Sequence, residues 1–229
     1  MMIVKWDFAW NILPVLLKAA ITTLEATALG YAMALSLGLV LAIVRRSRVR
    51  AISWTAGGII EFVRSTPFLI QLYFLYFILP NYGLTLPAFV TGILGLGIHY
   101  SAYTSEVYRA GIEGIPQGQW EAARSLNFTK LQIYRRIIIP QAIPPIVPAL
   151  GNYLVGMIKD TPILSAIAVV EIMQRAKIIG SETFRYLEPI TMVGIFFLLV
   201  SLVFSAFIRK VERGVSMDRR IEKAMEIKG

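Results

Sequence analysis

The stretch EAARSLNFTKLQIYRRIIIP, from Glu121 to Pro140, lies between two of the most apolar segments of the chain. It carries one acidic residue, four basic residues and a proline. Charged side chains are costly at the centre of a membrane, at about 2.5 to 3.5 kcal/mol each on insertion scales. This stretch is therefore predicted to lie outside the hydrocarbon layer, where it can meet a soluble partner.

The composition predicts a membrane protein. Of the 229 residues 56% are hydrophobic and only 16% are charged, and the mean hydropathy is +0.65, whereas about a quarter of the residues of soluble domains are charged. A soluble globular domain is the disfavoured alternative. Cysteine is absent, which excludes disulfides, thiolate metal sites and a thiol nucleophile. The first residues, MMIVKWDFAWNILP, do not resemble a removable signal peptide, so the first apolar segment is expected to remain as a membrane anchor.

Five apolar runs have about the length of membrane-spanning helices, which need roughly 20 residues. They lie near residues 20–44, 65–80, 87–108, 137–158 and 188–208. A weaker segment from Ala51 to Val63 is expected to continue into the second run with a break near Pro67, because proline removes a backbone donor. The predicted fold class is all-α, with one transmembrane domain over residues 1–229.

Basic residues gather in three connecting segments that fall on the same side of a five-span arrangement. They are Arg45, Arg46, Arg48 and Arg50, then Arg109, Arg124, Lys130, Arg135 and Arg136, then Arg209, Lys210, Arg213, Arg219, Arg220, Lys223 and Lys228. Cytoplasmic loops carry an excess of Lys and Arg, so the amino terminus is predicted outside and the carboxyl terminus in the cytoplasm. The basic residues behind the net charge of +9 are thereby explained as cytoplasmic residues that orient the chain in the membrane. Nucleic-acid binding is the weaker alternative, because no recognition motif accompanies the charge.

Within the opening stretch, the pattern predicts a short helix, a tight turn and a second helix. The helix over QGQWEAARSL is expected to end at Asn127, which tolerates a left-handed backbone, and the next helix to start at Thr129 as an N-cap. Helical spacing places the polar residues Glu121, Arg124 and Ser125 on one exposed side. Beside them are two small residues, Ala122 and Ala123, which allow another surface to approach closely. A solvated loop with incidental helix is the alternative.

This stretch resembles the EAA loop of the permease subunits of ATP-binding-cassette importers. The matching residues are Glu121, Ala122, Ala123, Ile137 and Pro140. Asn127 replaces the glycine of that pattern and Ile139 replaces a leucine. Both departures are mild, because Asn adopts the left-handed conformation more readily than most residues and Ile keeps the apolar volume.

The resemblance extends over nearly the whole chain. EFVRSTPFLIQLYFLYFILP is similar to a signature of the polar amino acid permeases, with Ser65 in place of glycine, and SAYTSEVYRAGIEGIPQGQWEAA fits the same subfamily. Two stretches, GLGIHYSAYTSEVYRAGIEGIP and ALGNYLVGMIKDTPILSAI, most resemble ectoine and hydroxyectoine permeases. The resemblance implies a five-span type I importer permease of the MetI-like fold in the inner (cytoplasmic) membrane of a prokaryote, which moves polar amino acids or ectoine-type solutes and is not an enzyme.

The resemblance also implies partners. A coupling helix from Ile115 to about Asn127, within a loop over about 109–136, would sit in a groove of a separate ATPase subunit. That subunit would hold ATP and magnesium, since this chain has no GxxxxGK[ST] sequence to cradle nucleotide phosphates, and no cofactor is expected here. The other implied partners are an identical or paralogous permease, forming a dimer, and an extracellular or periplasmic solute-binding protein.

Ionisable and polar residues within the spans are candidates for solute binding, because they are expensive in lipid. The candidates beside the Pro67 break are Arg64, Thr66 and Gln71, and those at the end of the fourth run are Tyr153, Lys159 and Asp160. A zwitterion needs a basic donor for its carboxylate and an acid or aromatic face for its cation. Arg64 or Lys159 would take the carboxylate, and Asp160 or Tyr153 the cation.

Structural roles remain open for each of these groups. Arg64 and Glu61 are three residues apart and would form a structural ion pair, as would Glu106 and Arg109. Lys159 and Asp160 would cap the fourth span at the outer surface. Lys18 and Glu25 would anchor a helix end. His99 is expected to be a packing histidine, since no second histidine exists for a metal pair.

Two other functional classes are weaker. A secondary transporter or channel subunit would need acids suited to ion coupling, and only Glu25 and Glu106 qualify. A membrane-bound enzyme would need a catalytic constellation that the sequence does not offer.

Overall fold

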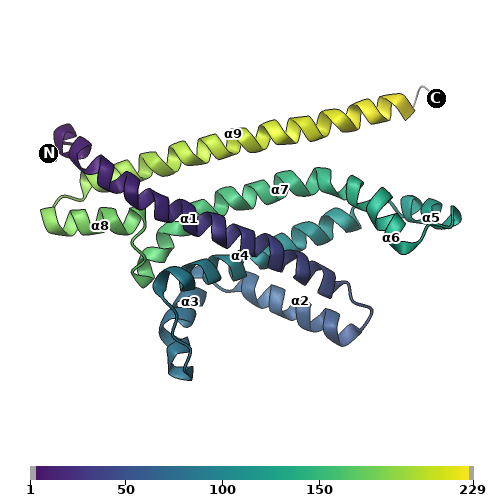
Figure 1. Ribbon diagram of the computed structural model, residues 1–229, viewed down its shortest axis with the longest axis horizontal. Coiled ribbons are helices and arrows are strands. Elements are labelled where there is room, and N and C mark those ends of the chain that lie inside the picture. The colour runs from purple at the N-terminus through teal and green to yellow at the C-terminus, as the bar shows by residue number, and fades with distance from the viewer. Residues whose placement is uncertain (1–3, 227–229) are drawn as a thin grey trace.

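The computed structural model describes the backbone of residues 4–226 and the side chains of residues 4–214, and all regular structure in this range is helical (Figure 1). The elements are α1 (Trp6–Arg45), α2 (Arg50–Ser65), α3 (Phe68–Tyr73), the π-helical turn η1 (Phe74–Ile78), the 3-10 helix η2 (Leu79–Tyr82), α4 (Ala88–Glu113), α5 (Gln117–Ser125), α6 (Lys130–Ile133), the π-helical turn η3 (Tyr134–Ile138), α7 (Ile139–Asp160), the 3-10 helix η4 (Thr161–Ile167), α8 (Ile172–Thr183) and α9 (Leu187–Glu226).

Within the described residues, three helical segments are long and apolar enough to cross a membrane: 6–45, 130–167 and 187–214. A fourth is added if α2 and the segment 68–82 count as one bent span. The remaining predicted span is α4, whose 26 residues reach about 39 Å at 1.5 Å per residue. It is less apolar because it is central, packs along α1 and buries small and polar side chains such as His99, Ser101 and Thr104.

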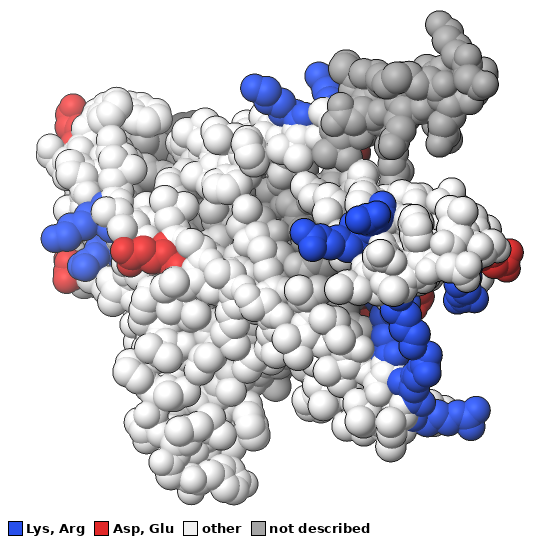
Figure 2. All heavy atoms as spheres, turned by 45° about the vertical axis from the view of Figure 1, so that its right-hand side comes forward, with Lys and Arg blue, Asp and Glu red and all other residues white. Residues whose placement is uncertain are grey.

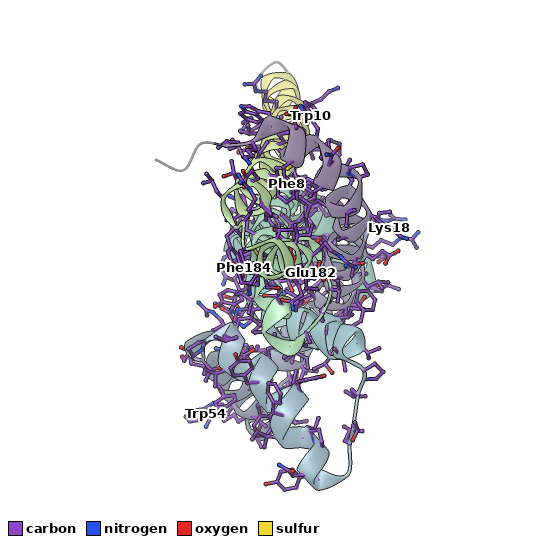
Figure 3. All side chains as sticks on the ribbon, turned by 90° about the vertical axis from the view of Figure 1, so that its left-hand side faces the viewer. Phe8, Trp10, Lys18, Trp54, Glu182 and Phe184 are labelled. Carbon is purple, nitrogen blue, oxygen red and sulfur yellow. The ribbon has the colours of Figure 1, made fainter. Side chains whose placement is uncertain are left out.

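Two expectations about helix placement were wrong. The first helix begins at Trp6 rather than near residue 20, because Lys18 is exposed on its surface and does not interrupt it (Figure 3). The helix α8 was not foreseen, since its Arg175, Lys177 and Glu182 break up any apolar run. Its buried side chains Ile172, Ala176 and Ile179 pack with apolar residues of α1 and α9.

The predicted break near Pro67 is confirmed. The axes of α2 and the helical segment that follows differ by 105°, and Figure 1 shows this segment leaving the body of the molecule. The segment is not one straight helix, as the second apolar run suggested, because α3 passes into η1 and η2 before Gly83. Pro80, which has no N–H to donate to a regular helix, lies in the last of these turns.

The start of α8 is fixed by a buried acid. The Glu171 carboxylate accepts backbone N–H groups of Met173 at 2.9 Å and Gln174 at 2.7 Å, and Thr23 of α1 accepts the N–H of Ile172. Burial raises the pKa of Glu171 to about 7, against the effect of the two N–H donors. Together these contacts tie α8 to the middle of α1.

The described basic residues of the three predicted segments lie at one end of the molecule. The α1–α2 turn, α5, α6 and the distal part of α9 share that end in Figure 1, and the amino terminus and α8 lie at the other. Figure 2 shows Lys and Arg at the ends and along the edge, beside a broad face without charged side chains. The side chains of Arg219, Arg220, Lys223 and Lys228 lie outside the described residues. The common end agrees with the grouping inferred from the sequence.

Candidate functional site

The turn after α5 has the left-handed geometry that the sequence predicts. Asn127 has φ 56°, its N–H donates to the carbonyl oxygen of Arg124 at 2.9 Å, and the N–H of Phe128 donates to that of Ala123 at 3.2 Å. These two bonds form a Schellman motif, which satisfies carbonyls at a helix end. The asparagine thus occupies the position where the related pattern has glycine.

The predicted N-cap at Thr129 is also confirmed. Its hydroxyl accepts the N–H of Gln132, and the Gln132 side chain accepts the N–H of Thr129 at 2.8 Å, which completes a capping box. The helix then runs through η3 into α7, where Pro140 is the second residue. The π-helical turn precedes the proline because the ring cannot take part in a regular hydrogen-bond ladder.

The two alanines of the predicted coupling surface face in different directions. Ala123 is fully buried among Ile115, Ile133 and Ile138, so the expectation that both alanines are open to another surface was wrong for Ala123. Ala122 is exposed. A helix this short presents only one face outward, and the alanine that faces inward lets α5 pack closely on its own chain.

The outward face of α5 is polar with an apolar edge. Glu121, Arg124 and Ser125 are exposed, as predicted. Leu126 is 67% exposed and Leu131 is 74% exposed. Neither leucine was predicted to matter from the sequence, although both interrupt the polar pattern.

Replacing Asn127 tests the geometry of this turn. We expect Asn127→Gly to keep the stability of the wild type, because glycine adopts φ above zero without a Cβ penalty. Asn127→Val should lower the free energy of unfolding, since the left-handed conformation costs roughly 1 to 2 kcal/mol per non-glycine residue and more for a β-branched one. Thermal unfolding of both variants checks this. Equal unfolding temperatures for the two variants would contradict it.

A second group of polar residues surrounds the break between α2 and α3. The Gln71 side-chain nitrogen donates to the Val63 carbonyl at 2.7 Å, to the Thr66 carbonyl at 3.1 Å and to the Thr66 hydroxyl at 2.6 Å. Its oxygen lies 3.1 Å from Nδ1 of His99. These contacts satisfy carbonyls that the break leaves without helical partners, and they join the break to α4.

An aromatic cluster continues from His99 toward α7. The ring of Tyr103 lies 5.2 Å from that of His99 and 5.6 Å from that of Tyr153, measured between centroids. The Tyr100 hydroxyl donates to Oδ2 of Asp160 at 2.7 Å. At the other end, the Arg64 guanidinium lies 5.6 Å from the centre of the Tyr103 ring. The cluster therefore has a cation at one end, an anion at the other and three tyrosines between them.

Five of the six predicted solute residues take part in these two connected groups: Arg64, Thr66, Gln71, Tyr153 and Asp160. Lys159 does not, because it is exposed and forms no ion pair with Asp160 within the described residues. The outer cap suggested for Lys159 and Asp160 stays a prediction. The Thr66 hydroxyl is already engaged by Gln71 and serves the break itself.

Tyr100 and Tyr103 were not predicted from the sequence, and His99 was expected only to pack. His99 is 8% exposed and does pack, against Phe68, but it also contacts Gln71. The signal in the sequence was the spacing of His99 and Tyr103, which puts both on one side of a helix. Only the packing of α4 against α3 and α7 shows that this side meets the other candidates.

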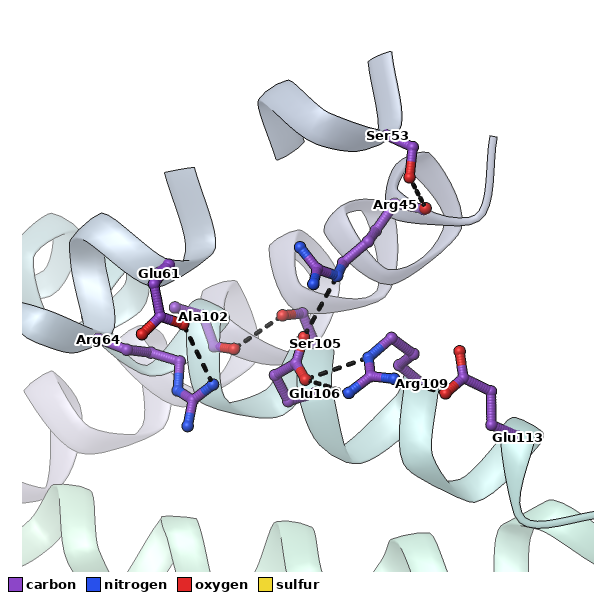
Figure 4. A network of polar contacts seen from close by, with 9 residues as sticks. All are labelled: Arg45, Ser53, Glu61, Arg64, Ala102, Ser105, Glu106, Arg109 and Glu113. Atoms are coloured by element: carbon purple, nitrogen blue, oxygen red, sulfur yellow. Dashed lines mark hydrogen bonds and ion pairs between the residues drawn. The ribbon is translucent and has the colours of Figure 1, made fainter. Parts of the chain in front are cut away.

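Charged residues form a separate network at the end of the molecule that carries the α1–α2 turn (Figure 4). The expected Glu106–Arg109 pair is present at 2.6 Å. Arg45 lies 3.7 Å from Glu106, and Glu113 lies 2.5 Å from Arg109. The network connects α1 to α4, which leads directly into α5, so a structural role for Glu106 fits its contacts.

The remaining ionisable residues of the predicted spans also have defined surroundings. Arg64 pairs with Glu61 at 3.9 Å, in addition to its contact with Tyr103. Lys18 and Glu25 are both exposed, and Figure 3 shows Lys18 pointing away from α1. The described residues contain no group of three or more His, Cys, Asp or Glu side chains with the spacing of a metal site.

Residues 34–217 match the family model described as the binding-protein-dependent transport system inner membrane component. A probable amino-acid ABC transporter permease protein, y4tG, of Sinorhizobium fredii is 52% identical over 93% of this chain and 91% of its own length. The probable glutamine ABC transporter permease protein GlnM of Bacillus subtilis is 34% identical over 88% of this chain and 91% of its own length.

Solved structures agree. A chain from a structure described as an amino acid ABC transporter with histidines superposes with a TM-score of 0.88 at 38% identity, over 93% of this chain and 99% of that one. A chain of the MetNI methionine ABC transporter has a TM-score of 0.63 at 20% identity, over 91% of this chain and 99% of its own, which shows a shared fold. The chain therefore belongs to the binding-protein-dependent transport system inner membrane component family, as a permease subunit of an ABC amino-acid importer.

Proposed function

We propose that this permease imports a small zwitterion, a polar amino acid, through a site formed by Arg64, Tyr103, Tyr153 and Asp160. The observation that carries the proposal is the aromatic cluster with a cation at one end and an anion at the other. The guanidinium of Arg64 suits a carboxylate, and Asp160 suits an ammonium group. Tyrosine faces between them attract the cation.

The exposure of the charged end of this cluster supports assembly with a second permease. The Arg64 side chain is 38% exposed, although Arg64 stands near the end of α2, about 21 Å from its first residue. Ionisable groups at such a depth face protein or a water-filled path rather than lipid. We assign this face to the solute path, completed by an identical or paralogous permease.

The polar end of the molecule supports the remaining assignments. We place α5 and its turn in the cytoplasm, against an ATPase subunit that holds ATP and magnesium, because this end carries the described basic clusters and the exposed Glu121 face. The opposite end would receive solute from an extracellular or periplasmic binding protein. The amino terminus is then outside and the carboxyl terminus inside.

Ectoine-type solutes are the second candidate. The cation of such a solute is delocalised over an amidine, and flat delocalised cations stack well on aromatic rings. The tyrosine cluster of Tyr100, Tyr103 and Tyr153 favours that chemistry. The relative GlnM is described as a probable glutamine permease, which favours an amino acid as the first candidate.

Reconstitution tests the proposal. Proteoliposomes containing the permease, its candidate ATPase and a binding protein should take up labelled polar amino acid or ectoine only when ATP is supplied on the ATPase side. A catalytically inactive ATPase is the matched control and should abolish uptake. Uptake by the permease alone, driven by a proton or sodium gradient, would contradict the import mechanism and favour a secondary transporter.

A further inference from the structure

A cleft of about 880 Å³ lies between α1, α2 and α4 at the end of the molecule that carries the α1–α2 turn. Arg45 and Arg46 of α1, Trp54 and Gly58 of α2, and Arg109 of α4 contribute to its walls. None of these residues belongs to the aromatic cluster or to the exposed face of α5. The cleft borders the aromatic cluster through Glu61, which lines the cleft and pairs with Arg64, but it shares no lining residue with that cluster or with the exposed face of α5.

The charged residues that line the cleft leave a small positive excess, because Arg45, Arg46 and Arg109 line it together with Glu61 and Glu113. The acids Glu61, Glu106 and Glu113 are each within 4 Å of an arginine, namely Arg64, Arg45 or Arg109. These three acids and three bases balance one another. By contrast, the next arginines along the chain are exposed and form no ion pair within the described residues: Arg46, Arg48 and Arg50.

The wall formed by α2 combines an interfacial aromatic residue with a gap. Trp54, Gly58 and Phe62 are four residues apart and share one stripe of the helix. Trp54 is 80% exposed, Phe62 is 68% exposed, and no atom lies within 4 Å of the position that a Cβ on Gly58 would occupy. Figure 3 shows Trp54 on the outside of the bundle. Gly58 thus leaves an apolar notch between two aromatic side chains.

We propose that this cleft binds an anionic phospholipid, with its phosphate against Arg46 and an acyl chain in the notch over Gly58. Tryptophan is enriched where a membrane meets water, which places Trp54 at headgroup level. Basic pockets between membrane helices bind anionic head groups. The apolar stripe runs from Trp54 toward Phe62 and away from Arg46 and Arg50, the same order in which a lipid presents its head and its chains.

Such a lipid would touch the helices that adjoin the charged network. Arg45 contacts Glu106 in that network and also fills the space beside Gly57, where an added Cβ would lie 2.0 Å from its guanidinium. A headgroup in the cleft would therefore rest on the junction of α1, α2 and α4, close to the start of α5. This binding does not depend on which solute is moved.

Native mass spectrometry of the purified full-length chain tests the site. Phosphatidylglycerol is titrated against the wild type, Arg46→Gln and Gly58→Leu, with phosphatidylcholine as the zwitterionic reference lipid. We expect the wild type to retain phosphatidylglycerol preferentially. Arg46→Gln should weaken that retention about fivefold, the effect of one surface arginine, and Gly58→Leu should weaken it severalfold by filling the notch.

Two matched controls separate the cleft from a general surface effect. Arg213→Gln removes the same charge from α9 at the same end, and Gly194→Leu fills a glycine on α9 that also has nothing within 4 Å of its Cβ position. Both should retain the lipid as the wild type does. Equal retention by Gly58→Leu and Gly194→Leu would overturn the proposal, as would the absence of a preference for phosphatidylglycerol. If the mass of a dimer disappears in Gly58→Leu but not in Gly194→Leu, the notch binds a second copy of the permease rather than a lipid. That result would also overturn the proposal.

Discussion

Reversing the charge of Glu121 should reduce ATP-driven uptake about tenfold or more while leaving the permease folded and inserted. Glu121 is exposed on α5 beside Ala122, so lysine there changes the surface presented to the proposed ATPase subunit without disturbing a packed contact. Like charges brought together at an interface cost several kcal/mol. ATP hydrolysis by the assembled complex should persist at a basal rate that solute no longer stimulates.

Glu182→Lys is the control for this variant. Glu182 is also an exposed helical glutamate, but it lies in α8 at the opposite end of the molecule (Figure 3). Uptake, ATPase stimulation and the amount of protein in the membrane are measured for both variants. The docking role of α5 is refuted if Glu121→Lys transports normally, or if both variants lose uptake to the same extent.

Asp160→Asn should raise the KM for solute uptake about 30-fold or more. The carboxylate is at the anionic end of the aromatic cluster and accepts a hydrogen bond from Tyr100 at 2.7 Å. Asparagine keeps the size and one acceptor oxygen but loses the charge that would face the solute cation. Removing one partner of a buried charge pair costs roughly 2 to 5 kcal/mol, and 2 kcal/mol corresponds to about 30-fold in affinity.

The neighbouring lysine provides the matched control, because Lys159 is adjacent in sequence but exposed and outside the cluster. Lys159→Gln should change the KM less than twofold. Uptake at varied solute concentration, together with basal ATPase activity, separates weaker binding from a folding defect. A large effect of Lys159→Gln with little effect of Asp160→Asn would place the solute carboxylate at Lys159 and refute the proposed site.

Local features of the sequence were sufficient to predict local structure. Pro67 predicted a break because a missing N–H acts within one turn, and Asn127 predicted a left-handed turn because that preference belongs to the residue itself. Thr129 predicted a helix start for the same kind of reason. Helices interrupted by charge were harder to predict, and α8 was missed because its apolar side faces only α1 and α9.

The candidate solute site could be listed from the sequence but not assembled. Intramembrane polar residues are unusual enough to mark Arg64 and Asp160 as candidates. Arg64 and Asp160 belong to one cluster because Arg64 contacts Tyr103 of α4 and Asp160 contacts Tyr100 of α4. Asp160 lies sixty residues further along the chain than Tyr100. Side-chain periodicity carries no information about which helices become neighbours. For the same reason, Lys159 was indistinguishable from Asp160 until the structure placed it on the surface.

The sequence by itself determined that this chain is an all-helical membrane protein with its basic segments on one side and a Glu-Ala-Ala loop among them. Those properties follow from composition and from backbone preferences that act over a few residues. Only the tertiary structure decided that Ala123 faces inward while Ala122 faces outward, and that a cation and an anion flank one aromatic cluster. Such outcomes depend on packing between distant segments, because burial is a property of the neighbours that a residue meets and not of the residue alone.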